Sequence, residues 1–175
     1  MNRTRRYDFL VRAAMAAAII FTAFTGSVHA IDSQLTRQTL AGLQGVYLIV
    51  EELNPNIDKY TKKNNLTSKR LYSAVEQKLS EAGIRIFTWE QWLKAPRRPM
   101  LYVNVNTHPT QFVVGYDVRI ELRQIVTIDA LQVKTLAGTW SMNMTGVADR
   151  ESLNAIKDNI GHLTDRFISA YKSVN

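Results

Sequence analysis

Apolar and polar side chains alternate along three segments in the second half of the chain, at residues 100–106, 112–128 and 136–144. Successive side chains of a strand point to opposite faces of a sheet, so this period of two predicts three strands with one dry face each. In the longest segment the alternation continues to Gln124, a lone polar residue on the apolar side. That side carries Val114, Tyr116, Val118, Ile120 and Leu122.

The polar side of the same segment carries charges of alternating sign, within the stretch GYDVRIELRQ. They are Asp117, Arg119, Glu121 and Arg123. This pattern predicts the solvated outer face of a strand, with weak ion pairs between neighbours. If the stripe has a function, the pattern favours recognition.

Two further segments repeat their apolar residues every three or four positions, the period of an amphipathic helix. The first is predicted over 68–82, with Thr67 or Ser68 as its N-cap and Gly83 just after its end. The second is predicted over 150–173. Its apolar stripe is Leu153, Ile156, Ile160, Leu163, Phe167, Tyr171 and Val174.

The remaining apolar runs are shorter. Residues 45–50, GVYLIV, predict a central strand, and residues 84–87, IRIF, predict another directly after the first helix. A capping box from Thr88 to Gln91 opens a short helix that Pro96 ends. These elements predict a strand, helix, strand unit.

The connecting segments are polar. Residues 31–45 are expected to be a lead-in that Leu35, Leu40 and Leu43 dock onto the domain. Residues 59–65, KYTKKNN, predict a basic loop, and residues 107–110 predict a turn.

Together these elements predict an α+β fold in which residues 31–175 form a single domain. We expect a two-layer sandwich with a mostly antiparallel sheet of four to five strands. Two helices, 68–82 and 150–173, would pack on one face and leave the other face partly open.

The first thirty residues differ from the rest of the chain. Four arginines within residues 3–12 precede about sixteen uncharged residues, and Val28-His29-Ala30 offers a small-residue cleavage site. The apolar run is shorter than the ~20 residues of a spanning helix, which predicts a signal cleaved after Ala30, periplasmic location and no stable transmembrane anchor. Both the Sec and the twin-arginine routes remain open.

Composition narrows the function classes. The chain has no cysteine, which excludes disulfides, thiolate metal sites and a cysteine nucleophile. Without the signal, 18 basic and 14 acidic residues leave a net charge of +4. This mild excess favours an envelope protein or an anionic envelope component as partner and argues against nucleic acid.

Candidate catalytic groups are few. Asp117 and Glu121 lie four residues apart on a strand, hence about 13 Å, beyond the ~5 to 9.5 Å of glycosidase carboxyl pairs. The adjacent Glu51 and Glu52 would point to opposite faces of their strand. Because no metal-binding, serine-hydrolase or phosphate-loop motif is present, we expect no metal, no cofactor and no enzymatic activity.

Two further groups suit binding. One is basic: Lys62 and Lys63 in the predicted loop, with Arg97 and Arg98 in PRRP. The other is aromatic, Trp89 and Trp92 beside that arginine pair, a combination typical of interface hot spots.

The stretches GVYLIVEEL, LTSKRLYSAVEQKLSEAGI, WLKAPRRPMLYVNV and DRFISAYKSVN resemble a group of small exported bacterial proteins of unassigned function. The resemblance implies an α+β fold and export. In topology the chain also looks like envelope assembly domains, namely the lipopolysaccharide-assembly lipoprotein LptE, whose lipid-bearing cysteine it lacks, and the amino-terminal domain of TolB.

The sequence therefore predicts a periplasmic, non-enzymatic binding or accessory protein of the bacterial cell envelope. One alternative is a hydrolase acting on an envelope polymer. Another is a carrier of a small apolar ligand held between sheet and helices.

Overall fold

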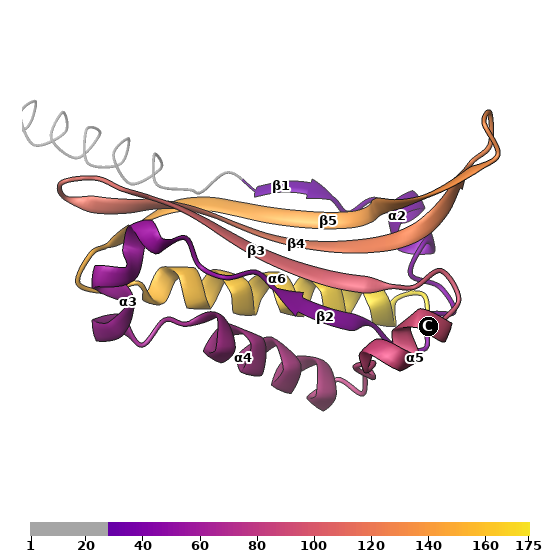
Figure 1. The fold of residues 1–175 in the computed structure, drawn as a ribbon, viewed down its shortest axis with the longest axis horizontal. Coiled ribbons are helices and arrows are strands. Elements are labelled where there is room, and N and C mark those ends of the chain that lie inside the picture. Colours follow the sequence, from indigo (N-terminus) through magenta and orange to yellow (C-terminus); the bar gives the residue numbers. More distant parts are fainter. Residues whose placement is uncertain (1–27) are drawn as a thin grey trace, which may run out of the picture.

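Five strands form one sheet in the order β1-β5-β4-β3-β2 (Figure 1). The computed structural model describes residues 28–175, with side chains from residue 31. The strands are β1 (Val28–Ile31), β2 (Tyr47–Val50), β3 (Met100–Pro109), β4 (Val113–Ile128) and β5 (Val133–Asp149). β2 runs parallel to β3 and the other neighbours are antiparallel, so the predicted fold class is confirmed.

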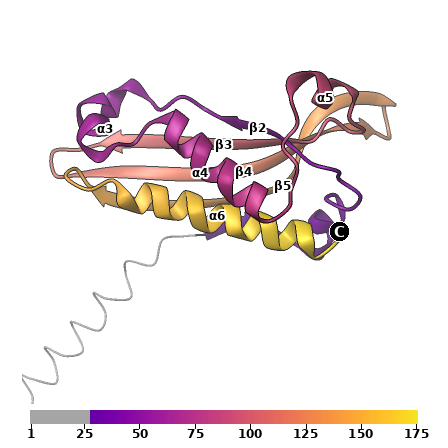
Figure 2. The same ribbon diagram turned by 90° about the horizontal axis from the view of Figure 1, so that it is seen from below.

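Two long helices cover one face of this sheet, α4 (Ser68–Glu81) and α6 (Asn154–Lys172) (Figure 2). Thr67 is the N-cap of α4, where its side chain accepts a hydrogen bond from the Arg70 amide, and Gly83 has a φ of 79° just beyond the helix end. Both helix predictions are confirmed within a few residues. Shorter helices are α2 (Gln34–Gln38), the 3₁₀ turn η1 (Pro55–Ile57), α3 (Asp58–Asn64) and α5 (Trp89–Lys94).

The core lies between the apolar side of the strands and these two helices. The ring of Trp140 from β5 meets that of Phe167 from α6 edge-on, with 5.4 Å between centroids. Gln124 is 1% exposed on this side, as its place in the pattern predicts. It donates to the Thr39 carbonyl and the Thr139 hydroxyl, so this buried polar group ties the segment after α2 to the sheet.

The predicted strand at 84–87 is wrong. In this segment only Ile86 forms a bridge, to Val46. Thr88 then caps α5, and the chain enters the sheet at β3 instead, where the Tyr47 amide donates to the Pro99 carbonyl. The parallel crossover from β2 therefore passes through α4 and α5 before it reaches β3.

Three connecting segments also differ from expectation. Residues 58–64 form α3 and not a loop. The helix follows directly on η1 and ends at Asn65, which has the left-handed conformation common after helix ends. Leu35 does not dock, since it lies on α2 and is 75% exposed, whereas Leu40 and Leu43 are buried. The turn predicted at 107–110 comes later, because β3 pairs with β4 as far as Pro109.

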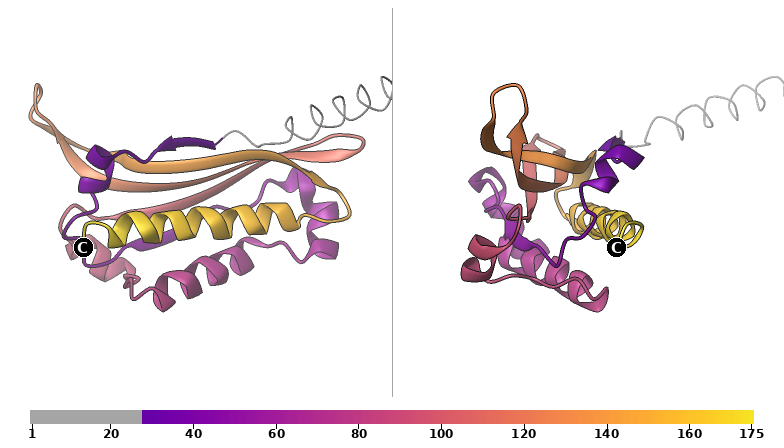
Figure 3. Two further views of the ribbon diagram at one scale, coloured as in Figure 1. Left: turned by 180° about the vertical axis from the view of Figure 1, so that it is seen from behind. Right: turned by 90° about the vertical axis from the view of Figure 1, so that its right-hand side faces the viewer.

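The β4–β5 hairpin extends past the helices and curls away from them at its tip (Figure 3). Residues 1–27 of the predicted signal lie outside the described residues, and residues 28–30 fall in β1. In the described part of the chain, no helix combines the length and the apolar character needed to cross a membrane.

Candidate functional site

The open face of the sheet, on the side away from α4 and α6, places the polar stripe of β4 between polar side chains of β3 and β5. The register sets Glu121 opposite Tyr102 and Arg119 opposite Asn104, with Asn143 of β5 on the other side of Arg119. We call this set the open-face network: Glu51, Tyr102, Asn104, Asp117, Arg119, Glu121, Arg123, Asn143 and Thr145.

Glu121 is the buried centre of this network. Its carboxylate lies 3.2 Å from the Arg123 guanidinium and 3.7 Å from that of Arg119, and the residue is only 9% exposed. Gly138 on β5 leaves the space it occupies, because a Cβ there would lie 2.9 Å from Glu121 Cδ. The prediction of a solvated stripe is therefore wrong at Glu121, while Arg119 remains exposed.

Next to it, Arg123 stacks on an aromatic ring. Its guanidinium carbon lies 3.9 Å from the Tyr102 ring centroid. The Tyr102 hydroxyl and the Asn104 amide both donate to the carboxylate of Glu51, and these bonds lower the pKa of Glu51. The bond to Glu51 also raises the pKa of the Tyr102 hydroxyl. Side chains of β3 and β4 and Glu51, directly after β2, thus hold one another in place.

At the far end of the network, hydrogen bonds hold the Asp117 carboxylate in place. Asp117 accepts from the Asn143 amide and the Thr145 hydroxyl, both at 3.0 Å. Glu52 belongs to the other side of the sheet, where it accepts from the Ser68 hydroxyl at 2.9 Å. Glu51 and Glu52 therefore point to opposite faces, as predicted, and do not form a pair.

An aromatic cluster covers the other end of the open face. Trp89 and Trp92 of α5 lie with ring centroids 4.8 Å apart, and Tyr47 of β2 contacts both. Trp92 packs with Phe87 and Met100 in a small core separate from the main one, whereas Trp89 is 49% exposed. Of the two tryptophans predicted to serve binding, Trp92 is part of a core and Trp89 is exposed to solvent.

The predicted basic residues do not form one site. Arg97 donates to the carbonyls of Thr39 and Ala41 and so fixes the segment after α2. Arg98 donates to the Leu93 carbonyl and lies over Trp92, beside the aromatic cluster.

Lys62 and Lys63 lie on α3, at the end of the molecule away from α5 (Figure 1). Lys63 is paired with Glu151 on the exposed surface. The structure therefore separates the two lysines from Arg97 and Arg98, with which the sequence grouped them.

A buried carboxylate anchors the chain just after β1. Asp32 accepts two hydrogen bonds from Arg37, at 2.6 and 2.7 Å, one from the Trp140 indole at 2.9 Å and one from Arg166 at 3.3 Å. These partners, with Arg37 foremost, lower the pKa of Asp32 to about 2. Sequence reasoning missed this anchor because Trp140 and Arg166 are more than a hundred residues away from Asp32.

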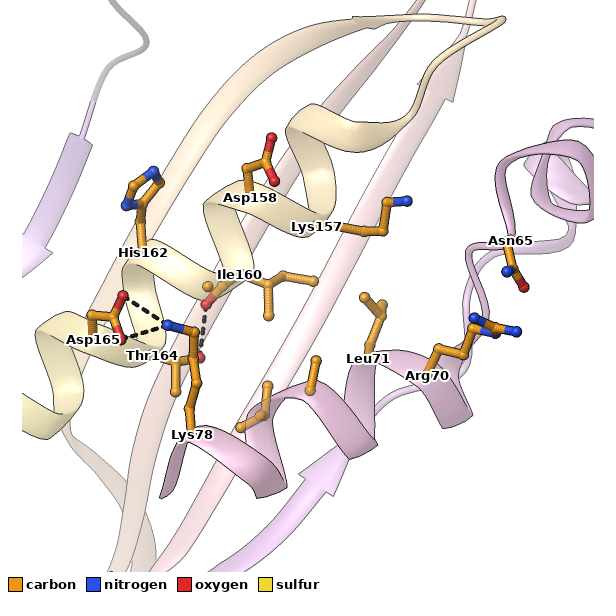
Figure 4. Close-up of a pocket in the computed structure, with 13 residues that line it drawn as sticks. Asn65, Arg70, Leu71, Lys78, Lys157, Asp158, Ile160, His162, Thr164 and Asp165 are labelled. Carbon is orange, nitrogen blue, oxygen red and sulfur yellow. Dashed lines mark hydrogen bonds and ion pairs between the residues drawn. The ribbon is translucent and has the colours of Figure 1, made fainter. Parts of the chain in front are cut away.

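A groove lies between α4 and α6, on the helix-covered side of the sheet (Figure 4). This groove has a volume of about 480 Å³, with Leu71, Ala74 and Val75 on one wall and Ile160 and Gly161 on the other. The groove was not predicted, since it depends on how two distant helices meet. The one feature of the sequence that could have indicated the groove is the presence of the small residues Ala74 and Gly161 next to the apolar stripes of the two helices.

Among the described residues no group of three or more His, Asp or Glu side chains is gathered as metal ligands would be. No protein-family model and no curated protein matches the chain.

Two crystal forms of the PelC dodecamer from Paraburkholderia phytofirmans have a similar fold. One, with a leucine-to-methionine substitution, is 16% identical at a TM-score of 0.45, over 79% of this chain and 95% of that chain. The other is 18% identical at a TM-score of 0.44, over 84% and 97%. No inference about function follows from a likeness at this level, and the resemblances noted from the sequence stay predictions.

Proposed function

We propose that the protein is an exported, non-enzymatic binding protein of the cell envelope whose open sheet face docks a partner protein. The observation that carries the proposal is the continuity of this face. The exposed Trp89, packed on the buried Trp92, adjoins a polar network whose side chains are already fixed by mutual contacts. Aromatic and arginine side chains supply most of the binding energy in protein interfaces, and a polar rim supplies specificity.

The charges on this face favour a protein over a simple anion. Arg119 and Arg123 stand among three carboxylates, Glu51, Asp117 and Glu121, so the network carries no excess of positive charge. A surface of alternating sign matches a partner that presents both signs. Fixing the side chains beforehand also reduces the entropy lost on docking.

The shifted carboxyl groups support binding over the hydrolase alternative. A general acid needs a carboxyl whose pKa is raised towards the working pH. In the described part of the chain, the carboxyl groups with shifted pKa values are Asp32, Glu51 and Glu90, and each is lowered.

The proposal that the protein is exported is supported by the signal-like sequence of residues 1–30.

Site-specific photo-crosslinking in the producing cell tests the proposal. A photoreactive residue in place of Asn106, exposed on β3, should give a discrete protein adduct, and one in place of Ser169, exposed on α6, should not. The adduct should weaken in Trp89→Ala and in Arg119→Glu/Arg123→Glu. It should persist in Lys69→Glu/Lys172→Glu, which changes two exposed charges on the helices.

Equal adducts from both positions, or an adduct that neither open-face variant weakens, would show that this face is not the docking surface. An adduct that contains lipid or glycan and no protein would show that the partner is not a protein.

A further inference from the structure

We propose that the groove between α4 and α6 binds a small anionic amphiphile, a medium-chain carboxylate whose head lies between Arg70 and Lys157. This inference goes beyond the docking function, because the groove is on the helix-covered side of the sheet (Figure 4). It rests on the shape of the groove and on the placement of its charges.

The groove exists because small residues occupy the positions where the helices face each other. Ala74 is exposed on α4, and a Cβ added at Gly161 on α6 would meet only the side chain of Lys78, at 3.6 Å. Larger neighbours, Leu71, Val75 and Ile160, are buried and form an apolar floor. A volume of about 480 Å³ falls within the roughly 300–1,000 Å³ typical of small-molecule sites.

The charges divide the groove into two unlike ends. At one end Lys78 is paired with Asp165, at 2.7 and 2.9 Å from its two carboxylate oxygens. At the other end lie Arg70 and Lys157, and neither forms an ion pair with a described carboxylate. The contact of Lys157 there is a long one, 3.4 Å to the Asn64 carbonyl.

The other polar residues that line the groove are Asn65, Asp158, His162 and Thr164. Lys157 points from α6 towards Asn65 and Arg70, whereas Asp158 points away from them (Figure 4). Asn65 adds an amide beside the two cations. A guanidinium and an ammonium at one end therefore complement a carboxylate, and the apolar floor accepts its chain.

The dimensions suggest the length of the ligand. From Arg70 to Lys78 the helix rises by ~12 Å, at 1.5 Å per residue. This length suits a medium chain lying parallel to α4, with its end near the Lys78–Asp165 pair. An inorganic anion would leave the apolar floor exposed to water, and an uncharged chain would form no ion pair with Arg70 or Lys157.

The test is a titration of the purified protein with decanoate, decanol and acetate, followed by amide chemical shifts. Decanoate should shift groove residues with roughly tenfold higher affinity than decanol, and acetate should have little effect. Arg70→Gln/Lys157→Gln should reduce decanoate affinity to that of decanol. Lys94→Gln/Lys172→Gln, a matched pair outside the groove, should leave the affinity unchanged.

A second variant separates occupancy from folding. Ala74→Trp fills the groove from an exposed position, so it should abolish decanoate shifts while the melting temperature stays close to that of the parent protein. Three results would overturn the proposal: decanoate and decanol binding equally well, acetate binding as tightly as decanoate, or decanoate shifts outside the groove only. None of these bears on the open face.

Discussion

The two faces of the sheet come from the same strands, yet they are stabilised by different interactions. The covered face is apolar and dry, with Trp140 packed against Phe167 under α6. The open face holds its side chains by ion pairs and hydrogen bonds around Glu121, with an aromatic cluster at one end. Folding stability is therefore concentrated on the covered side, and the proposed docking surface is on the other side.

The largest effect is expected on the covered face. Phe167→Ala removes a fully buried ring and should lower the free energy of unfolding by about 3–5 kcal/mol. Phe112→Ala, at an exposed position, makes the same chemical change and should cost less than ~0.5 kcal/mol. Urea unfolding of both variants measures the contrast, and similar losses would mean that the covered face does not dominate stability.

The Asp32 anchor should give the next effect, with a distinct pH dependence. The pKa of about 2 lies below the unfolded value of about 3.9, so the carboxylate contributes about 2–3 kcal/mol at neutral pH. Because the folded pKa is depressed, this stabilisation is present above about pH 4 and is lost as the pH falls towards 2.

Asp32→Asn should therefore lose about 2–3 kcal/mol at pH 7 and little at pH 2, in urea unfolding at several pH values. Asp129→Asn, an exposed position in the β4–β5 turn, serves as the control for the change in charge. A constant difference between Asp32→Asn and the parent protein across this range would contradict the ionised anchor.

A smaller effect is expected at the centre of the open face. Gly138→Ala forces Glu121 away from its arginines and should cost about 1–2 kcal/mol. With Glu121 already replaced by Ala, the same Gly138→Ala change should cost much less, because the clash is gone. A double-mutant cycle measures the coupling, and additive losses would show that the two residues do not compete for space.

The smallest effect is expected for a pair outside both faces. Lys63 and Glu151 are largely exposed, so Lys63→Gln should change stability by less than ~0.5 kcal/mol, and added salt should reduce even that. A loss above 1 kcal/mol in thermal unfolding at low salt would place this pair among the structural contacts.

Much of the fold could be predicted because the spacing of apolar residues along the chain is enough to identify the helices and most of the strands. Alternation along 112–128 separates Ile120 from Glu121, and the structure places them on opposite faces. The same reasoning placed Gln124 inside, where it is buried. Segment 84–87 has the composition of a strand, yet its pairing is limited to Val46, which donates to the Arg85 carbonyl and accepts from the Phe87 amide, and Thr88 then begins α5.

The candidate sites were predicted less completely. The stripe from Asp117 to Arg123 was identified, but Tyr102, which contacts Arg123, lies on β3, and Glu51, which contacts Tyr102, follows β2. The prediction that Lys62 and Arg97 belong to one basic site was wrong. Two residues that carry the same charge can lie far apart in the fold.

By itself, the sequence determined which residues face the core and which face water along each element, because helix and strand periods are local properties of the backbone. Only the tertiary structure decided which distant residues touch. The burial of Glu121 depends on Gly138 in the next strand, the anchor at Asp32 on Trp140, and the groove on two small residues in separate helices. Such contacts follow from register and helix packing, which a local pattern does not encode.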